Sequence, residues 1–140
     1  MNIKIIKTIL IILVVIITLV GAIMINNRVE EQRTGTIQEI SASRLRSWLQ
    51  SDQEILLIDV RTEEEYAAKH IPGSTLIPLE MINETVPFMA PELNSRIVVY
   101  CESGQRSREA AILLTELGYE RIYDFGSLNN WNYNFAQGLG

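Results

Sequence analysis

The sequence predicts an α/β domain with a parallel β-sheet and helices on both faces, preceded by one transmembrane helix. After residue 36, short apolar runs alternate with amphipathic helical patterns, as they do where helices connect parallel strands. An apolar run of 21 residues, 5–25, stands near the amino terminus. With 47% hydrophobic residues, eight Gly and four Pro in 140 residues, the composition excludes a collagenous, low-complexity or wholly disordered chain.

The apolar run is long enough to cross a membrane, which takes about 20 residues. A cleaved signal peptide has a shorter apolar core of about 7–15 residues, ending at a small-x-small site. Val20-Gly21-Ala22 would serve poorly as such a site, because the chain stays apolar through Ile25. We therefore predict an uncleaved anchor over residues 1–25, in contact with the lipid bilayer through residues 5–25.

The charges that flank this run bear on its orientation. The amino terminus, Lys4 and Lys7 lie at its amino-terminal edge, and Arg28 and Arg33 follow it, so that positive-inside counting favours a cytoplasmic amino terminus by one charge. The very short amino-terminal tail is typical of a signal anchor, which favours a domain on the extracytoplasmic face.

Residues 26–36 are polar and without periodicity, and we interpret them as a linker to a domain over 37–140. The first predicted elements are a strand at 37–40 and a helix capped by Ser41 or Ser43. A nearly continuous apolar run at 54–60 is typical of a central parallel strand buried on both faces. Thr62 and Glu65 form a capping box for a short helix.

The second half of the domain continues the alternation. We expect a strand around 75–77, a short helix with loops over 78–91, and a buried strand at 96–100. Apolar residues at 110, 113, 114 and 117 have helical spacing, and Gly118 is well placed to end that helix. A last strand follows at 121–125, and Trp131 anchors the tail.

Charge and metal-ligand counts exclude several classes of function. Residues 26–140 carry ten basic and seventeen acidic side chains, which argues against nucleic-acid binding and against adhesion to anionic lipid. Cys101 and His70 are the only residues of their types. An intramolecular disulfide is therefore excluded, as are cysteine-based zinc sites and histidine-rich metal sites, and we expect no metal and no cofactor.

The loop after the strand at 96–100 contains the residues expected of a reactive cysteine site. Sites in open α/β sheets form where strands end and helices begin. Cys101 stands there, followed by Glu102, Ser103, Gly104, Gln105, Arg106 and Ser107. Backbone N–H groups of a tight glycine-containing loop, with the positive end of the next helix, would stabilise a thiolate. The alternative is an inert cysteine packed under the loop.

Four segments together resemble a single-domain rhodanese, a sulfurtransferase. They are Leu57-Ile58-Asp59-Val60-Arg61, Glu65-Tyr66 with His70-Ile71-Pro72-Gly73-Ser74, the cysteine loop at 101–107, and Gly118-Tyr119. The match covers nearly all of 37–131 in order and spacing. It implies a five-stranded parallel sheet with helices on both faces. It also implies that Cys101 accepts a sulfane sulfur, forms a persulfide cradled by loop amides, and passes the sulfur to a thiol or cyanide.

The length of the cysteine loop distinguishes close relatives of this family. Related phosphatases have five residues between cysteine and arginine, which fits a tetrahedral phosphate, whereas 102–105 are four residues here. Two positions depart from the family pattern. Glu102 replaces a frequent basic residue and would oppose thiosulfate, which favours a persulfide donor. Gly126-Ser127 replaces a frequent Gly-Gly, a change expected to affect only a turn.

Other polar residues have competing interpretations. Asp59 would orient the loop, or else cap the next helix or pair with Arg61. Arg106 would steer an anionic donor or brace the loop by bonding its carbonyls, and both roles suit arginine. His70 is expected to make a structural hydrogen bond, and the acidic run 63–65 to be a solvated helix start.

Three hypotheses about function follow. The first is a sulfurtransferase that uses thiosulfate or a low-molecular-weight persulfide, with a thiol or cyanide as acceptor. The second is a sulfur-carrier or redox module that serves one protein thiol partner and has little small-molecule turnover. The third is a phosphatase-type or arsenate-type enzyme, which the short loop disfavours.

Overall fold

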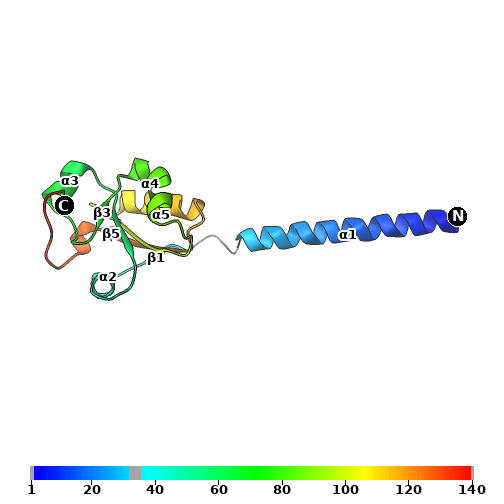
Figure 1. The fold of residues 1–140 in the computed structure, drawn as a ribbon, viewed down its shortest axis with the longest axis horizontal. Helices are drawn as coiled ribbons and strands as arrows, with labels where there is room; N and C mark the ends of the chain where they lie inside the picture. The colour runs from blue at the N-terminus through cyan, green and yellow to red at the C-terminus, as the bar shows by residue number, and fades with distance from the viewer. Residues whose placement is uncertain (1, 32–35, 140) are drawn as a thin grey trace. The chain divides into compact units, whose positions relative to one another are not determined.

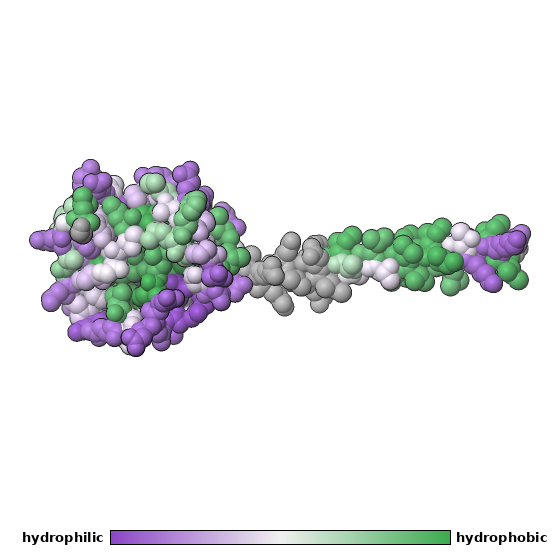
Figure 2. All heavy atoms as spheres, in the orientation of Figure 1, coloured by the Kyte–Doolittle hydropathy of each residue, from purple (hydrophilic) through white to green (hydrophobic). Residues whose placement is uncertain are grey.

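The computed structural model describes residues 2–31 and 36–139, which fall into two units, before and after the boundary between Arg33 and Thr34. The first unit is a single helix, α1 (Ile3–Glu31). Its residues Ile3–Met24 are long and apolar enough to cross a membrane, a test that a signal sequence also passes. Figure 2 shows the nearly continuous apolar surface of this stretch, interrupted by polar residues near the amino terminus. The helix continues through 26–31, the first part of the predicted linker, and residues 32–35 of that linker lie outside the described residues.

The second unit holds the predicted five-stranded parallel sheet. Its strands are β1 (Gln38–Glu39), β2 (Leu56–Asp59), β3 (Thr75–Leu76), β4 (Arg96–Cys101) and β5 (Arg121–Ser127). They lie in the order β1-β5-β4-β2-β3, and every pairing is parallel. All five predicted strands are therefore confirmed, although β1, β2 and β3 are shorter than the runs that predicted them.

The helices are α2 (Ala42–Leu49), α3 (Glu63–Ala68), α4 (Ile82–Met89) and α5 (Gln105–Glu116), with the 3₁₀ turns η1 (Leu79–Met81) and η2 (Leu128–Asn130). Figure 1 shows α4 and α5 on one face of the sheet and α2 on the other. The Ser41 side chain accepts from the backbone N–H of Arg44 and so caps α2. Thr62 and Glu65 form the predicted capping box at α3. Gly118, at φ 92°, follows the end of α5 as predicted.

Two apolar clusters cover the two faces of the sheet. Along β4, Ile97, Val99 and Cys101 belong to the cluster under α4 and α5, while Val98 and Tyr100 belong to the cluster with Leu45 of α2. This alternation is the period-two pattern of a strand buried on both faces. It places the Cys101 side chain on the α5 side of the sheet, at the carboxyl end of the central strand.

Candidate active site

The cysteine loop joins the end of β4 to the start of α5. Gly104 precedes α5 at φ 96°, a left-handed conformation that glycine adopts without strain. Its N–H donates to the Cys101 Sγ at 3.0 Å, and its carbonyl accepts from the Ser107 Oγ at 3.1 Å. The loop therefore turns a backbone donor and the amino end of a helix toward the sulfur, an arrangement that stabilises an anion there. Cys101 itself is fully buried.

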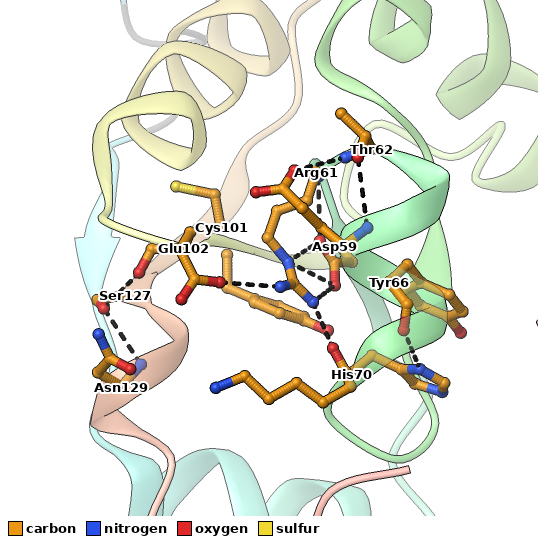
Figure 3. A network of polar contacts seen from close by, with 12 residues as sticks. Asp59, Arg61, Thr62, Tyr66, His70, Cys101, Glu102, Ser127 and Asn129 are labelled. Atoms are coloured by element: carbon orange, nitrogen blue, oxygen red, sulfur yellow. Dashed lines mark hydrogen bonds and ion pairs between the residues drawn. The ribbon is translucent and has the colours of Figure 1, made fainter. Parts of the chain in front are cut away.

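Asp59, at the end of β2, forms a buried ion pair with Arg61. The Arg61 Nη2 donates to Asp59 Oδ2 at 2.8 Å, and the two side chains are 2% and 0% exposed. Arg61 Nη2 also donates to the Lys69 carbonyl at 2.6 Å, and its Nη1 donates to Glu102 Oε2 at 2.9 Å. The Arg61 guanidinium thus bonds Asp59, the Lys69 carbonyl at the end of α3, and Glu102, the first residue after Cys101 (Figure 3).

The pKa values of this network follow from burial and pairing. Burial disfavours the charge of Arg61, but the hydrogen bonds and charge of Asp59 outweigh it and raise the pKa of Arg61 above its usual value. Burial raises the pKa of Tyr100, whose hydroxyl accepts from the Ile71 N–H at 3.1 Å. Both groups keep their ordinary charge states at neutral pH.

A second ion pair lies beside the loop, between Arg106 at the start of α5 and Glu65 of α3. The two bonds are 2.8 Å and 2.7 Å, a bidentate contact. Hydrogen bonds from Arg106 lower the pKa of Glu65 to about 2. The Arg106 head therefore bonds a carboxylate, and no bond to a loop carbonyl occurs among the described residues. Glu65 is not simply solvated as expected, because it also holds Arg106.

Ser127, the last residue of β5, contacts the loop from a third direction. Its Oγ donates to the Glu102 carbonyl at 2.6 Å and accepts from the Asn129 N–H at 3.1 Å. The expectation that Gly126-Ser127 affects only a turn is wrong, because the serine hydroxyl braces the cysteine loop. The strand predicted from the sequence ended at 125, so no sequence signal placed Ser127 beside the loop.

The remaining predicted residues can now be placed. Asp59 pairs with Arg61, and Thr62 caps α3 instead. The Nδ1 of His70 lies 2.9 Å from the Tyr66 carbonyl, and the two rings stack at 3.7 Å, which is the expected structural role. Ser103 and Gln105 are exposed, and the Ser103 hydroxyl makes no hydrogen bond to the described part of the chain.

The described residues form no metal cluster, and a cavity in the second unit lies away from Cys101. Residues 2–31 and 36–139 hold no group of three or more metal-ligating side chains. A cavity of about 720 Å³ is lined by the first residues of β2, β4 and β5, which are Leu56, Arg96 and Arg121. It therefore lies at the amino ends of the strands, at the opposite edge from Cys101.

Comparison with known proteins agrees with this geometry. Residues 41–134 match the model of the rhodanese-like domain. The chain belongs to the rhodanese family. It is 36% identical over 73 residues to the thiosulfate sulfurtransferase PspE of Escherichia coli. The alignment covers 52% of this chain and 70% of that protein.

A second relative and a solved structure are also similar to this chain. The putative sulfur carrier protein YrkF of Bacillus subtilis is 34% identical over 93 residues, which is 65% of this chain but only 48% of that relative. A solved rhodanese with anions from E. coli superimposes with a TM-score of 0.58 and 32% identity, over 61% of this chain and 100% of that one. The rhodanese fold and kinship with sulfurtransferases are thereby established.

Proposed function

We propose that this protein is a sulfurtransferase that carries sulfane sulfur on Cys101. The observation that supports it most is the thiol at the end of the central strand, with the Gly104 N–H on its sulfur at 3.0 Å. A second anionic sulfur bound to Cys101 would meet the same amino end of α5. Arg61 and Ser127 hold the loop in place on either side.

The proposed cycle has two transfers. The Cys101 thiolate attacks the terminal sulfane sulfur of the donor, an S–S bond forms on Cys101, and the donor S–S bond breaks with its electron pair leaving on sulfite or a thiolate. A thiol or cyanide then attacks the outer sulfur and takes it, which returns Cys101 to the thiolate. The electron pair that the thiolate uses in the first step returns to it in the second, so the proposed cycle needs no oxidant or reductant and uses no metal or cofactor.

The charges at the loop favour a persulfide donor over thiosulfate. Glu102, 42% exposed, places a carboxylate next to Cys101. The guanidinium groups of Arg61 and Arg106 are each already bound to carboxylates. A thiosulfate dianion therefore meets a carboxylate and no uncommitted guanidinium of this pair, whereas an ionised persulfide group carries only a single negative charge.

Turnover of the full-length chain in neutral detergent tests this proposal. Thiosulfate or glutathione persulfide would be supplied with cyanide, and thiocyanate would be measured for the wild type and for Cys101→Ser. We expect release that depends on Cys101 and is faster with the persulfide. Glu102→Gln, which keeps shape and removes charge, should raise the thiosulfate rate relative to the persulfide rate. Equal rates for wild type and Cys101→Ser would contradict the enzyme proposal, and an unchanged donor ratio would contradict the role of Glu102.

A partner-specific sulfur carrier is the second candidate. The burial of Cys101 favours it, because a small donor reaches the sulfur only after the loop or its side chains move. The likeness to a protein named as a putative sulfur carrier points the same way. Loading of Cys101 in stoichiometric amount without thiocyanate turnover would support this candidate over the enzyme.

We further propose that residues 1–25 anchor the domain 37–140 in a membrane through linker 26–36, with the domain outside the cytoplasm. The support is the apolar stretch Ile3–Met24. Because Cys101 is buried, topology is better tested with Glu109→Cys, an exposed position of α5, in a Cys101→Ser background. Labelling of intact cells by a membrane-impermeant maleimide is expected. Protection until lysis would contradict the orientation, and loss of the first 25 residues from the mature chain would contradict the anchor.

A further inference from the structure

Ser127 lies where the cysteine loop begins, and the sheet explains how it gets there. The register between β4 and β5 shifts after Val99 and Asp124, so that Tyr100 pairs with Gly126 and Cys101 pairs with Ser127. Phe125 is the extra residue of this bulge, and Gly126 takes φ 76° with its N–H on the Asp124 carboxylate at 2.9 Å. A bulge re-aims the side chains that follow it. Here it brings the Ser127 hydroxyl to the loop.

The hydroxyl of Ser127 is bonded on both sides. It donates to the Glu102 carbonyl at 2.6 Å and accepts from the Asn129 N–H at 3.1 Å, so its rotation is fixed. The carboxylate of the same Glu102 is held by Arg61 at 2.9 Å. The first residue after Cys101 is thus held through its main chain by Ser127 of β5 and through its side chain by Arg61, two residues after β2.

A fixed carbonyl also fixes the N–H across the same peptide bond. The Glu102–Ser103 peptide is planar and trans, so the Ser103 N–H points opposite to the Glu102 carbonyl and away from Ser127. In Figure 3, the Cys101 sulfur lies on the other side of the loop backbone from Ser127. The Gly104 N–H already donates to the Sγ atom, and the Ser103 N–H, one residue earlier in the loop, is a further donor for a sulfur bound beyond it.

We propose that Ser127 is a positioning residue, which turns the Ser103 N–H toward the outer sulfur of a Cys101 persulfide. This rests on the proposed function. The hydroxyl touches neither sulfur and acts through one peptide bond. Its effect should therefore fall on the persulfide form and not on the resting thiol.

The loading equilibrium of the full-length chain in neutral detergent tests this role. Wild type, Ser127→Ala and Ser127→Thr would be equilibrated with fixed ratios of glutathione persulfide to glutathione, and the fraction of persulfidated protein read by intact mass. The loss of one neutral hydrogen bond should lower the loading constant of Ser127→Ala by about three- to tenfold. Threonine keeps the hydroxyl and should restore the constant to within about twofold. Ser51→Ala removes a comparable bond, from Ser51 Oγ to the Trp48 carbonyl at 2.9 Å, and should match the wild type.

The loading experiment distinguishes failure of the positioning role from failure of the proposed function. If wild type and Ser127→Ala load equally while both are folded, the positioning role is overturned and the sulfurtransferase proposal stands. If the wild type itself does not load, the proposed function fails first. A rate of Cys101 alkylation by iodoacetamide that falls as much as the loading constant would also overturn the role, because the hydroxyl would then act on the thiol or on the loop as a whole.

Discussion

The buried pair of Asp59 and Arg61 should be the polar contact on which the site depends most. Replacing Arg61 with methionine keeps an apolar stem of similar length but leaves the Asp59 carboxylate, which is 0% exposed, without its cation. The Lys69 carbonyl also loses the donor that it has at 2.6 Å. The perturbation therefore removes charge and hydrogen bonds while it largely preserves packing.

The structure sets the size of the expected effect. Removing one partner of a buried ion pair costs about 3–5 kcal/mol, because the remaining charge stays buried and unpaired. Glu102, which bonds the outer side of Arg61, is 42% exposed, so Glu102→Gln should cost about 1 kcal/mol or less. Asp59→Asn with Arg61→Met removes both charges, and the double variant should be more stable than the sum of the single effects by about 2 kcal/mol.

Urea unfolding at pH 7 would measure these differences. Trp48 and Trp131 both pack in the second unit, so their fluorescence reports its unfolding without interference from α1. A cost below about 1 kcal/mol for Arg61→Met, or additive single effects in the double variant, would refute the reasoning. Water would then be reaching a carboxylate that the structure places in the interior.

Three further predictions concern the surroundings of the loop. The pKa of Glu65 is lowered to about 2 from 4.5, so the ion pair with Arg106 stabilises the fold above pH 4.5 and loses this effect as the pH falls toward 2. Because Glu65 is 32% exposed, the pair should contribute about 1 kcal/mol. Between pH 4.5 and 2, the urea midpoint of the wild type should fall more steeply than that of Glu65→Gln. Parallel curves for the two proteins would contradict a stabilising ion pair. Gly104→Ala should lower the unfolding free energy by about 1–2 kcal/mol, because Gly104 has a φ of 96°. Gly104→Asn should lower it less, because asparagine adopts this conformation more readily. Equal losses would show that steric crowding, and not backbone strain, causes the loss of stability. His70→Phe keeps the ring stack on Tyr66 but loses the Nδ1 bond, so stability should fall by about 1 kcal/mol while sulfur loading stays unchanged, and a large loss of loading with intact stability would assign His70 to the chemistry.

The order of elements and the place of Cys101 could be predicted because they depend on local patterns. Apolar runs, a capping box and a terminating glycine each act over a few residues, and each is confirmed by the structure. The cysteine could be placed at a strand end because the buried run before it is continuous. The pairing of Asp59 with Arg61 could be predicted for the same reason, because the two residues are only two positions apart in the sequence.

The contacts that brace the loop could not be predicted in the same way. Arg106 and Glu65 are 41 residues apart, and so are Arg61 and Glu102. Which acid meets which arginine depends on how the β2–α3 segment sits beside the β4–α5 segment, and no local pattern predicts that. Ser127 reaches Glu102 only because a bulge after Asp124 shifts the register by one residue. One residue of register decides whether a side chain meets the loop.

The central claim is that Cys101 carries the sulfur, and the most direct measurement is the mass of the intact protein after brief reaction with glutathione persulfide. The account predicts that folded, reduced wild-type protein gains one sulfur atom, that cyanide removes it, and that Cys101→Ser gains none. A wild type that gains no sulfur, or a Cys101→Ser protein that gains as much, would contradict it.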